Sequence, residues 1–340
     1  MQILVLGGTR FVGRHIVEAA RAAGHAVSVF NRGTSALPWN DVEQITGDRA
    51  RGALDGLRRR EWDACIDVSG YLPGEVRASA GLLSGSVGRY VFISTASVYD
   101  LDGAAPGITE DDALLPVCED EDGVPPHLLY GSRKVACEHE AERAFPGRTL
   151  ILRPVIVAGP FDPTNRFPWW VERVAAGGDL LAPAGPEAPV QLIDGRDLAE
   201  FAIGLTAERA TGTFTVCGDP SSFDALIAAC RAATGSTAVP TWVPERVLVE
   251  HGVEPFDELP LWLDDVPEHR AFYAFSNVRA RAAGLALRPL EQTARDTWEW
   301  LRAVRAGAEP EPLAGAFVAR GLSPEREAAL LAAHRSDLLH

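Results

Sequence analysis

A tyrosine and a lysine four residues apart are the pair in this sequence best suited to acid–base chemistry. Tyr130 and Lys134 are the first and last residues of the segment Tyr-Gly-Ser-Arg-Lys, and a spacing of four places both side chains on one face of a helix. A free phenol has a pKa near ~10 and is a poor acid or base at neutral pH. A neighbouring ammonium lowers that pKa by stabilising the phenolate, so the pair can move a proton to or from a carbonyl or alcohol oxygen.

Hydroxyl side chains lie upstream of this pair. The strand predicted over Tyr90–Ser94 leads into Thr95 and Ser97. One of the three hydroxyl groups at positions 94, 95 and 97 can hydrogen-bond the same substrate oxygen that exchanges a proton with Tyr130.

A glycine-rich turn follows the first apolar run of the chain. Residues 7–13 read Gly-Gly-Thr-Arg-Phe-Val-Gly and lead into apolar residues at helical spacing. Backbone N–H groups and the helix dipole at such a turn suit a pyrophosphate, and the residues expected to contact it are Gly7, Thr9, Arg10, Phe11, Val12 and Gly13. Gly7 permits the tight turn and Gly13 permits close packing, whereas Arg10 replaces the middle glycine of the usual pattern. A purely structural turn is the alternative.

The end of the second predicted strand, Ala26–Phe30, bears on the choice of dinucleotide. Proteins that bind NAD usually carry an acid there for the ribose hydroxyls, and an acid would repel the 2′-phosphate of NADP. This chain has Asn31 and Arg32 instead. Because Arg32, helped by Arg10, could pair with that phosphate, the sequence favours NADP, with NAD as the second choice. A solvated turn residue is the alternative reading of Arg32.

Asp48 follows the third predicted strand, Glu43–Thr46, in a Gly-Asp-Arg run. Its carboxylate is placed to reach the adenine edge of a bound dinucleotide. A helix cap is an equally good interpretation of this residue.

Composition and charge exclude several classes of protein. Of the 340 residues, 46% are hydrophobic and 23% are charged, which is typical of globular proteins and suits about two domains. The net charge of −15 repels phosphate backbones and anionic lipids, so we expect a small-molecule substrate and neither nucleic acid nor a membrane surface as partners.

The cysteines and the N-terminus indicate a cytoplasmic protein. Five cysteines without a CxxC pair argue against a disulfide framework and a zinc site, and we expect no metal. The sequence shows no signal peptide and no apolar run approaching the ~20 residues of a membrane span.

Short apolar strands alternate with helices over the first half of the chain. The predicted strands are Gln2–Leu6, Ala26–Phe30, Glu43–Thr46, Ala64–Val68, Tyr90–Ser94 and Thr149–Arg153, and the helices between them are Phe11–Ala23, Ala50–Arg60, Gly74–Leu83 and Tyr130–Phe145. This alternation predicts an α/β fold of the Rossmann type, a doubly wound parallel sheet with helices on both faces.

Proline, glycine and tryptophan interrupt the pattern after residue 154, which predicts a smaller, irregular C-terminal substrate lobe. Ser323 is the expected N-cap of a final helix. The predicted division is 1–160 with 188–218 for the dinucleotide-binding domain, 161–187 with 219–320 for the lobe, and 321–340 for the C-terminal helix.

Four motifs in a fixed order carry a family resemblance. They are GGTRFVG at 7–13, ISTASVY at 93–99, YGSRK at 130–134 and LRPVIVAGP at 152–160. Over nearly its whole length the sequence resembles the extended short-chain dehydrogenases/reductases, the NAD-dependent epimerase/dehydratase family. The GGTRF turn resembles an atypical branch that includes plastid stem-loop RNA-binding proteins and bacterial proteins described as reductases or epimerases.

The resemblance implies roles for individual residues. Thr95 would polarise the substrate oxygen, Tyr130 would be the general acid/base, and Lys134 would lower the pKa of Tyr130 and bind the ribose. Asp197 matches an acid in a structural turn of the family. The further residues that the resemblance places against the cofactor are Ser69, Gly70, Tyr71, Pro154 and Ile156.

Candidate substrate contacts lie beyond the last motif. Arg166 could hold a phosphate or carboxylate, and Trp169 and Trp170 could form flat pocket walls. Packing of the second lobe is the alternative for the two indole rings.

The expected activity is hydride transfer between NAD(P) and a carbonyl or carbinol carbon of a small molecule. A redox-neutral epimerase of a nucleotide sugar or a similar compound, with a tightly held cofactor, would use the same residues. Dehydration is disfavoured because Ala96 and Ser97 follow Thr95, where the sugar dehydratases of the family have an Asp-Glu pair. The alternative from another class is a non-catalytic nucleotide-sensing or RNA-binding protein. A monomer and a homodimer are both compatible with the sequence.

Overall fold

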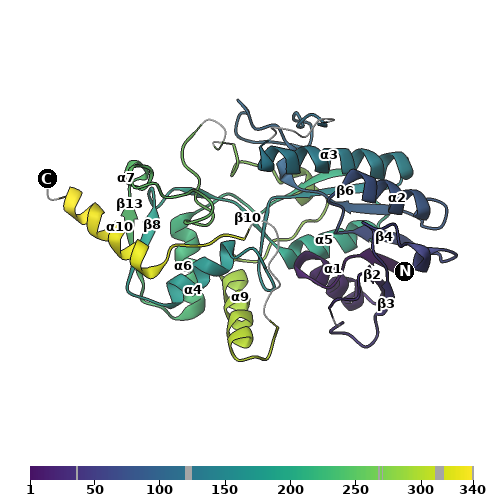
Figure 1. The fold of residues 1–340 in the computed structure, drawn as a ribbon, viewed down its shortest axis with the longest axis horizontal. Helices are drawn as coiled ribbons and strands as arrows, with labels where there is room; N and C mark the ends of the chain where they lie inside the picture. The colour runs from purple at the N-terminus through teal and green to yellow at the C-terminus, as the bar shows by residue number, and fades with distance from the viewer. Residues whose placement is uncertain (36, 119–124, 267–268, 270, 311–317, 339–340) are drawn as a thin grey trace. The chain divides into compact units, whose positions relative to one another are not determined.

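The computed structural model forms two compact units, shown together in Figure 1. It describes residues 1–35, 37–118, 125–266, 269, 271–310 and 318–338. Unit 1 comprises Met1–Val155, Gly195–Cys217 and Phe275–Ala286, and unit 2 comprises Ile156–Asp194, Gly218–Ala274 and Leu287–His340. The sequence prediction assigns 156–160, 188–194 and 218 to the dinucleotide-binding domain and 275–286 to the lobe, whereas the structure groups each with the other unit.

Unit 1 is built on a seven-stranded parallel sheet in the order β11-β6-β5-β4-β1-β2-β3. The strand order reverses between β1 and β4, and ligands of such sheets bind outside the carboxyl ends of the strands at this point. The strands are β1 (Gln2–Leu6), β2 (Ala26–Asn31), β3 (Glu43–Thr46), β4 (Ala64–Asp67), β5 (Tyr90–Ile93), β6 (Thr149–Pro154) and β11 (Gly212–Val216).

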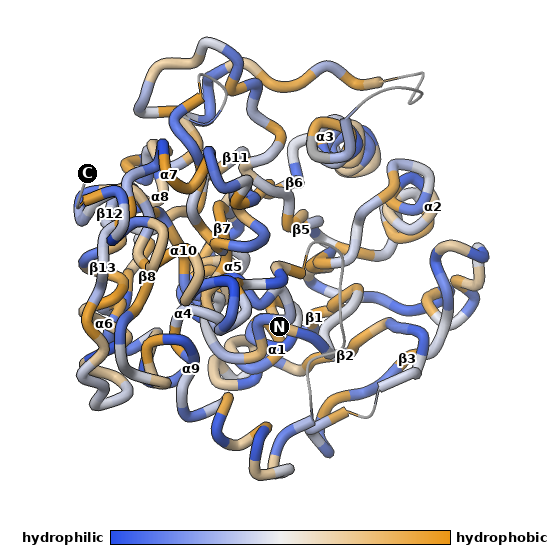
Figure 2. The backbone as a smooth tube through the Cα atoms, turned by 60° about the vertical axis from the view of Figure 1, so that its left-hand side comes forward, coloured by the Kyte–Doolittle hydropathy of each residue, from blue (hydrophilic) through white to orange (hydrophobic). Residues whose placement is uncertain are grey.

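Helices cover both faces of this sheet, which confirms the predicted doubly wound α/β class (Figure 1). Helix α1 (Phe11–Ala22) packs against α5 (Gly195–Ala207) on one face, and α2 (Pro73–Leu83) packs against α3 (Pro126–Ala144) on the other. Apolar side chains of α2 and α3 join the strands in one buried cluster. Strand β1, next to the central strand β4, is accordingly hydrophobic in Figure 2.

The helix predicted over Ala50–Arg60 is wrong. This segment forms turns, an isolated bridge between Asp48 and Ala53, and one 3₁₀ turn, η1 (Asp55–Leu57). Gly52 and Arg59 both have a positive φ, of 67° and 60°, which no right-handed helix accommodates. The other strands and helices predicted for this half of the chain agree with the structure to within a few residues at their ends.

Unit 2 has more regular structure than its composition predicts. Three short strand pairs join β7 (Ile156–Ala158) to β10 (Leu192–Asp194), β8 (Asp179–Pro183) to β13 (Val239–Val243), and β9 (Pro189–Val190) to β12 (Ser221–Ser222). Helices α4 (Arg166–Ala175), α6 (Phe223–Thr234) and α9 (Leu290–Arg305) pack on one another, and α7 (Glu245–Glu250) adds to their apolar core.

The last helix, α10 (Pro324–Asp337), contacts β8 and β13 of unit 2. The Ser323 hydroxyl accepts a hydrogen bond from the Arg326 N–H, which confirms the predicted N-cap. Among the described residues, none of the helices has both the length and the apolar character that crossing a membrane requires.

Candidate functional site

The glycine turn after β1 has the backbone geometry that its sequence predicts. Gly7 and Gly8 have φ values of 107° and 90°, a region that favours glycine. A Cβ atom on Gly7 would lie 2.6 Å from Val68, and one on Gly13 would lie 2.7 Å from the Gly8 nitrogen. The turn therefore has no space for side chains at these positions, and α1 begins directly against it.

Arg10 stands at the N-cap of α1, where the usual pattern has glycine. Its φ of −129° is available to any residue, its side chain is exposed, and it makes no capping hydrogen bond. The substitution therefore costs no backbone strain. The first N–H groups of α1 stay uncapped by this side chain, as an anion-binding helix start requires.

The end of β2 presents an exposed cation. The Asn31 Oδ1 atom accepts hydrogen bonds from the Gly33 N–H and from the Gln44 side chain, both at 2.8 Å, and so shapes the turn. Arg32 between them is exposed and makes no ion pair or hydrogen bond within the described residues. Its guanidinium is accordingly available to an anion.

Asp48 shapes the loop after β3. Its carboxylate accepts a hydrogen bond from the Ala50 N–H at 3.0 Å and lies 3.6 Å from the Arg51 guanidinium. A local capping contact therefore exists, although it belongs to a turn rather than to the predicted helix. Contact with an adenine edge stays a prediction.

Lys134 is buried where the ends of two strands meet. Its Nζ atom donates hydrogen bonds to the Gly70 carbonyl at 2.9 Å and to the Ile93 carbonyl at 2.8 Å, and it lies 4.2 Å from the centroid of the Phe92 ring. Only 3% of the residue is exposed, and this burial lowers the pKa of its ammonium to about 8. An ammonium has three N–H donors, so one remains beyond the two carbonyls.

A signal in the composition singles out the same residue. The chain contains 31 arginines, and Lys134 is its only lysine. Arginine is larger, planar and effectively always charged, so it cannot replace a compact ammonium in a buried position where the charge must be tuned. The sequence thus keeps lysine at the one place where the motif requires it.

Helix α3 carries Tyr130 to the segment that contains Thr95. Gly131 packs so tightly that a Cβ atom there would lie 2.0 Å from the Ser97 carbonyl oxygen. The two segments are therefore in direct backbone contact, and Tyr130, which is half-buried, precedes the contact point. A larger residue at position 131 would push α3 away.

The three candidate hydroxyl groups have different surroundings. The buried Ser94 donates to Glu138 of α3, which forms an ion pair with Arg153 at 2.7 Å. Thr95 is the N-cap of the 3₁₀ turn η2 (Ala96–Val98), where its Oγ1 accepts from the Ser97 N–H at 3.1 Å. Ser94 is thus engaged by the ion pair, whereas Thr95 and Ser97 hydrogen-bond each other at the strand end.

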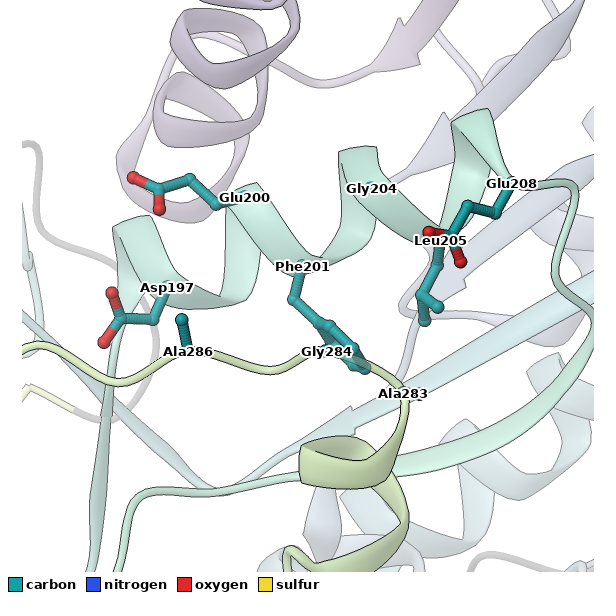
Figure 3. Close-up of a pocket in the computed structure, with 9 residues that line it drawn as sticks. All are labelled: Asp197, Glu200, Phe201, Gly204, Leu205, Glu208, Ala283, Gly284 and Ala286. Atoms are coloured by element: carbon teal, nitrogen blue, oxygen red, sulfur yellow. The ribbon is translucent and has the colours of Figure 1, made fainter.

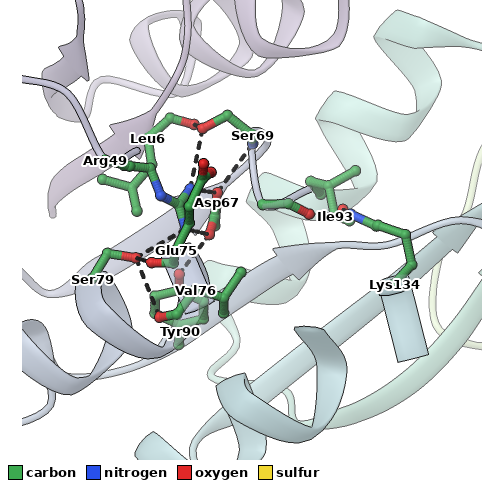
Figure 4. A network of polar contacts seen from close by, with 11 residues as sticks. Leu6, Arg49, Asp67, Ser69, Glu75, Val76, Ser79, Tyr90, Ile93 and Lys134 are labelled. Atoms are coloured by element: carbon green, nitrogen blue, oxygen red, sulfur yellow. Dashed lines mark hydrogen bonds and ion pairs between the residues drawn. The ribbon is translucent and has the colours of Figure 1, made fainter. Parts of the chain in front are cut away.

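An ion pair that the sequence analysis missed lies at the end of β4 (Figure 4). The Arg49 Nη1 and Nη2 atoms donate to the Asp67 carboxylate, at 2.7 and 2.8 Å, and the Tyr90 hydroxyl donates to the same carboxylate at 2.6 Å. Burial opposes ionisation of Asp67, yet Arg49 outweighs it and the pKa of Asp67 is lowered. A charged residue closing an otherwise apolar strand was the signal in the sequence.

The residues after Asp67 contact both the glycine turn and Lys134, and their contact with a cofactor stays a prediction. Ser69 donates its hydroxyl to the Leu6 carbonyl at 3.1 Å, so it lies beside the glycine turn. Gly70 holds Lys134 through its carbonyl. The Tyr71 ring is 58% exposed, with its centroid 5.8 Å from the Lys134 Nζ.

A model of a known protein family matches this chain. It describes the NAD dependent epimerase/dehydratase family and matches residues 3–70 and 74–217.

This chain belongs to that family.

Known proteins are similar to this chain in sequence or in fold. The chloroplast stem-loop binding protein of 41 kDa b from Arabidopsis thaliana is 27% identical over 279 residues, which span 75% of this chain and 67% of the relative. Among solved structures, a UDP-glucose 4-epimerase has a TM-score of 0.67 at 18% identity, with 91% of this chain and 100% of that chain covered. UDP-glucuronic acid 4-epimerase from Bacillus cereus, in complex with NAD, has a TM-score of 0.65 at 15% identity, covering 89% and 99%. At these identities the solved structures establish the fold.

Two predicted cofactor contacts, Pro154 and Ile156, lie on either side of the point along the chain where unit 1 passes into unit 2. Pro154 closes β6 in unit 1, and the N–H of the following residue, Val155, donates to the Val216 carbonyl. Ile156 opens β7 in unit 2 and is 8% exposed.

The predicted substrate contacts of the family member all lie on α4 of unit 2. The Arg166 guanidinium lies 4.7 Å from the Phe256 ring centroid. Trp170 is fully buried, donates its indole N–H to the Pro260 carbonyl and packs edge-on against Phe223, and Trp169 contacts Trp170 in the same core. Core packing, the alternative for both tryptophans, describes these contacts, while a substrate contact stays a prediction.

A pocket in unit 1 is lined by none of the predicted catalytic or cofactor-binding residues (Figure 3). It is formed between α5 and residues 283–286 and is lined by Asp197, Glu200, Phe201, Gly204, Leu205, Glu208, Ala283, Gly284 and Ala286. The buried Asp197 stands in the first turn of α5, where an acid suits the helix dipole.

Proposed function

We propose that this protein is an NAD(P)-dependent enzyme that interconverts a carbonyl and an alcohol on a small molecule, with Tyr130 as the general acid/base. The observation that carries the proposal is the only lysine of the chain, buried one helical turn from Tyr130 and held by two backbone carbonyls at strand ends. Burying an ammonium is costly, and a buried lysine with a lowered pKa beside a tyrosine is a candidate for chemistry.

The residues where the strand order reverses, between β1 and β4, fit a dinucleotide. The positive φ values of the glycine turn and the uncapped start of α1 suit the pyrophosphate. Lys134 retains one N–H for a ribose hydroxyl or for the Tyr130 oxygen. When bound, the nicotinamide supplies or accepts the hydride at the substrate carbon.

The chain's own residues would handle the oxygen and the proton. Tyr130 donates a proton to the substrate oxygen during reduction and removes it during oxidation. The Lys134 ammonium lowers the free energy of the Tyr130 phenolate. Thr95 offers its hydroxyl to the same oxygen from the segment that Gly131 contacts.

NADP is the proposed cofactor, and NAD is the alternative. The support for NADP is the exposed Arg32 at the end of β2, where NAD-specific proteins carry an acid. The Bacillus cereus structure holds NAD, which supports the alternative. Parallel titrations with both dinucleotides decide between them, and Arg32→Ala should weaken NADP binding while leaving NAD binding nearly unchanged.

A redox-neutral epimerization is the variant of this activity supported by the solved 4-epimerases. A net reductase releases its cofactor after each turnover, whereas an epimerase retains it. The small molecule that co-purifies with the protein separates the two, because its mass and absorbance spectrum identify a retained dinucleotide and its 2′-phosphate.

Replacement of Tyr130 by Phe tests the proposal. The variant should lose turnover, measured as the change in cofactor absorbance or as epimer formation, and should bind the dinucleotide nearly as the wild type does. Wild-type turnover in this variant would contradict the proposal.

RNA binding is a second candidate, favoured by the stem-loop binding relative from Arabidopsis thaliana. The net charge of −15 opposes it. Steep salt-dependent binding of a stem-loop RNA, together with no affinity for either dinucleotide, would favour this candidate over an enzyme.

A further inference from the structure

The Arg49–Asp67 ion pair of unit 1 is buried near Lys134 and makes hydrogen bonds to several further residues. The two side chains are 8% and 0% exposed. Besides Asp67, the guanidinium donates to the Ser79 hydroxyl at 2.9 Å and to the Ser69 hydroxyl at 3.2 Å (Figure 4). The pair therefore joins the loop after β3, the end of β4 and helix α2.

The carboxylate of this pair determines the path of the next three residues. Asp67 Oδ1 accepts a hydrogen bond from the Ser69 N–H at 3.0 Å. Gly70 then passes so close that a Cβ atom on it would lie 2.5 Å from the Phe92 ring and 3.1 Å from Asp67 Oδ2. The orientation of the Gly70 peptide thus depends on the carboxylate and on a side chain of β5.

The Gly70 carbonyl is one of the two acceptors that hold the Lys134 ammonium. A series of direct contacts consequently runs from Arg49 through Asp67, Ser69 and Gly70 to Lys134. The same Ser69 bonds Leu6 at the start of the glycine turn. Any shift of the ion pair would move both the lysine and the turn.

We propose that Arg49 and Asp67 are positioning residues for Lys134: their ion pair fixes the Ser69–Gly70 segment so that the Gly70 carbonyl holds the ammonium in place. The importance of this role for turnover rests on the proposed function, in which Lys134 acts on Tyr130 and the ribose. The contact itself does not depend on that function.

The electrostatics agree with the geometry. After burial, which lowers the pKa of Lys134 most, the groups that act on it are Cys137, Asp67 and Glu138, which raise it, and Arg49, which lowers it. Asp67 therefore supports the charged form of the lysine both directly and through the carbonyl that it orients.

The single lysine makes a direct experiment possible. Protein labelled with ¹³C at the lysine Cε gives one lysine resonance, which reports the titration of Lys134 without a substrate. We compare the wild type with Asp67→Asn, which removes the charge but retains an acceptor for Tyr90, and with Arg49→Lys, which keeps the charge but loses the two-pronged geometry. Arg49→Lys adds a second lysine resonance, so the Lys134 signal in that variant is assigned by comparison with the Arg49→Lys, Lys134→Met double variant, which retains only the lysine at position 49.

The expected result is a lower titration midpoint in both variants. The wild-type midpoint should lie at about pH 8. In Asp67→Asn it should fall by roughly one pH unit, as for other charge partners a few ångströms away. In Arg49→Lys the net charge is unchanged, so a fall would come from the loosened Gly70 carbonyl. Unchanged midpoints in both variants overturn the proposal, and an unchanged midpoint in Arg49→Lys alone reduces it to a coulombic effect and overturns positioning.

A matched control lies in unit 2, where the buried Glu327 forms an ion pair with the partly exposed Arg173 at 2.6 Å. Glu327→Gln is the same chemical change as Asp67→Asn and should leave the lysine midpoint at its wild-type value. If Asp67→Asn does not fold, Arg49→Lys still decides the question, because it buries no unpaired charge.

Dinucleotide titrations of the same samples distinguish this inference from the proposed function. A wild type that binds neither NAD nor NADP contradicts the proposed function, while the resonance still tests the contact. If the wild type turns over, both unit 1 variants should lose roughly 10- to 100-fold in kcat, as for other small displacements of catalytic groups.

Discussion

The two units of this protein each contain an arginine–carboxylate pair whose carboxylate is buried, but the pairs have different neighbours. In unit 1, Arg49 and Asp67 lie at the end of a central strand and contact the segment that holds Lys134. In unit 2, Arg173 and Glu327 join α4 to α10, and Glu327 also accepts from the Leu181 N–H of β8. Similar chemistry therefore supports a reactive group in one unit and the attachment of a terminal helix in the other.

The largest expected effect is a loss of turnover in Lys134→Met, which tests whether the unit 1 pair supports a reactive group. The change removes the ammonium and should lower kcat by about 10²- to 10⁴-fold, the usual contribution of general acid–base catalysis. Lys134→Arg should not restore the rate, because the guanidinium is too large for the two-carbonyl site. Steady-state kinetics and a melting curve check both variants, and wild-type kcat in either one would remove Lys134 from the chemistry.

Glu327→Ala should act on stability instead. It leaves the Arg173 Nε–H and the buried Leu181 N–H without their acceptor, while the Arg173 guanidinium keeps the Gly177 and Asp179 carbonyls. The loss should cost about 2–4 kcal/mol in the free energy of unfolding. Urea denaturation measures the loss. The surviving folded fraction should keep the wild-type lysine titration, and a shifted midpoint there would erase the difference between the two ion pairs.

The buried carboxyl of Asp162 in unit 2 should make the stability of the protein depend on pH. Burial raises the pKa of this carboxyl to about 6, although Thr164 donates to it and Arg166 lies nearby. The folded state therefore binds more protons than the unfolded state between about pH 4 and 6, and stability falls as the pH rises through this interval. The penalty at pH 7 should reach about 3 kcal/mol. Urea denaturation at pH 4 and 7 should show this fall in the wild type but not in Asp162→Asn, and equal pH dependence would contradict it.

Gly131→Ala tests whether the close contact between Gly131 and Ser97 positions α3. The new methyl group would meet the Ser97 carbonyl, so we expect a loss of about 1–3 kcal/mol in stability and a lower kcat as α3 moves. Gly81→Ala on α2 is the control: no atom lies within 4 Å of its Cβ position, and alanine favours the helix by roughly 0.5–1 kcal/mol. Equal stability changes in the two variants would show that the contact at position 131 is loose.

Sequence reasoning predicted unit 1 well because its signals are local. Apolar runs flanked by glycine gave β1 and β2, and the Tyr-Gly-Ser-Arg-Lys segment was placed correctly on a helix. The error over Ala50–Arg60 came from reading polar composition as helical, where Gly52 and Arg59 turn the chain. The Arg49–Asp67 pair was missed because its partners are brought together only by the sheet.

Unit 2 was harder to predict because its elements are short and its core is assembled from distant segments. Helix α6 nevertheless carried local signals, since Ser222 caps its start and Gly235, with a φ of 69°, ends it. Trp169 and Trp170 were open to two interpretations in the sequence. Their burial depends on residues such as Phe223 and Pro260, which no local pattern connects to them.

The single lysine also affects how the chain can be cut. A protease specific for lysyl bonds has one target in all 340 residues, and that target lies inside α3 with its side chain enclosed. Cleavage would therefore require at least local opening of α3, and its rate would report how often this helix opens. The products would be two fragments, which divide the chain between Lys134 and Val135.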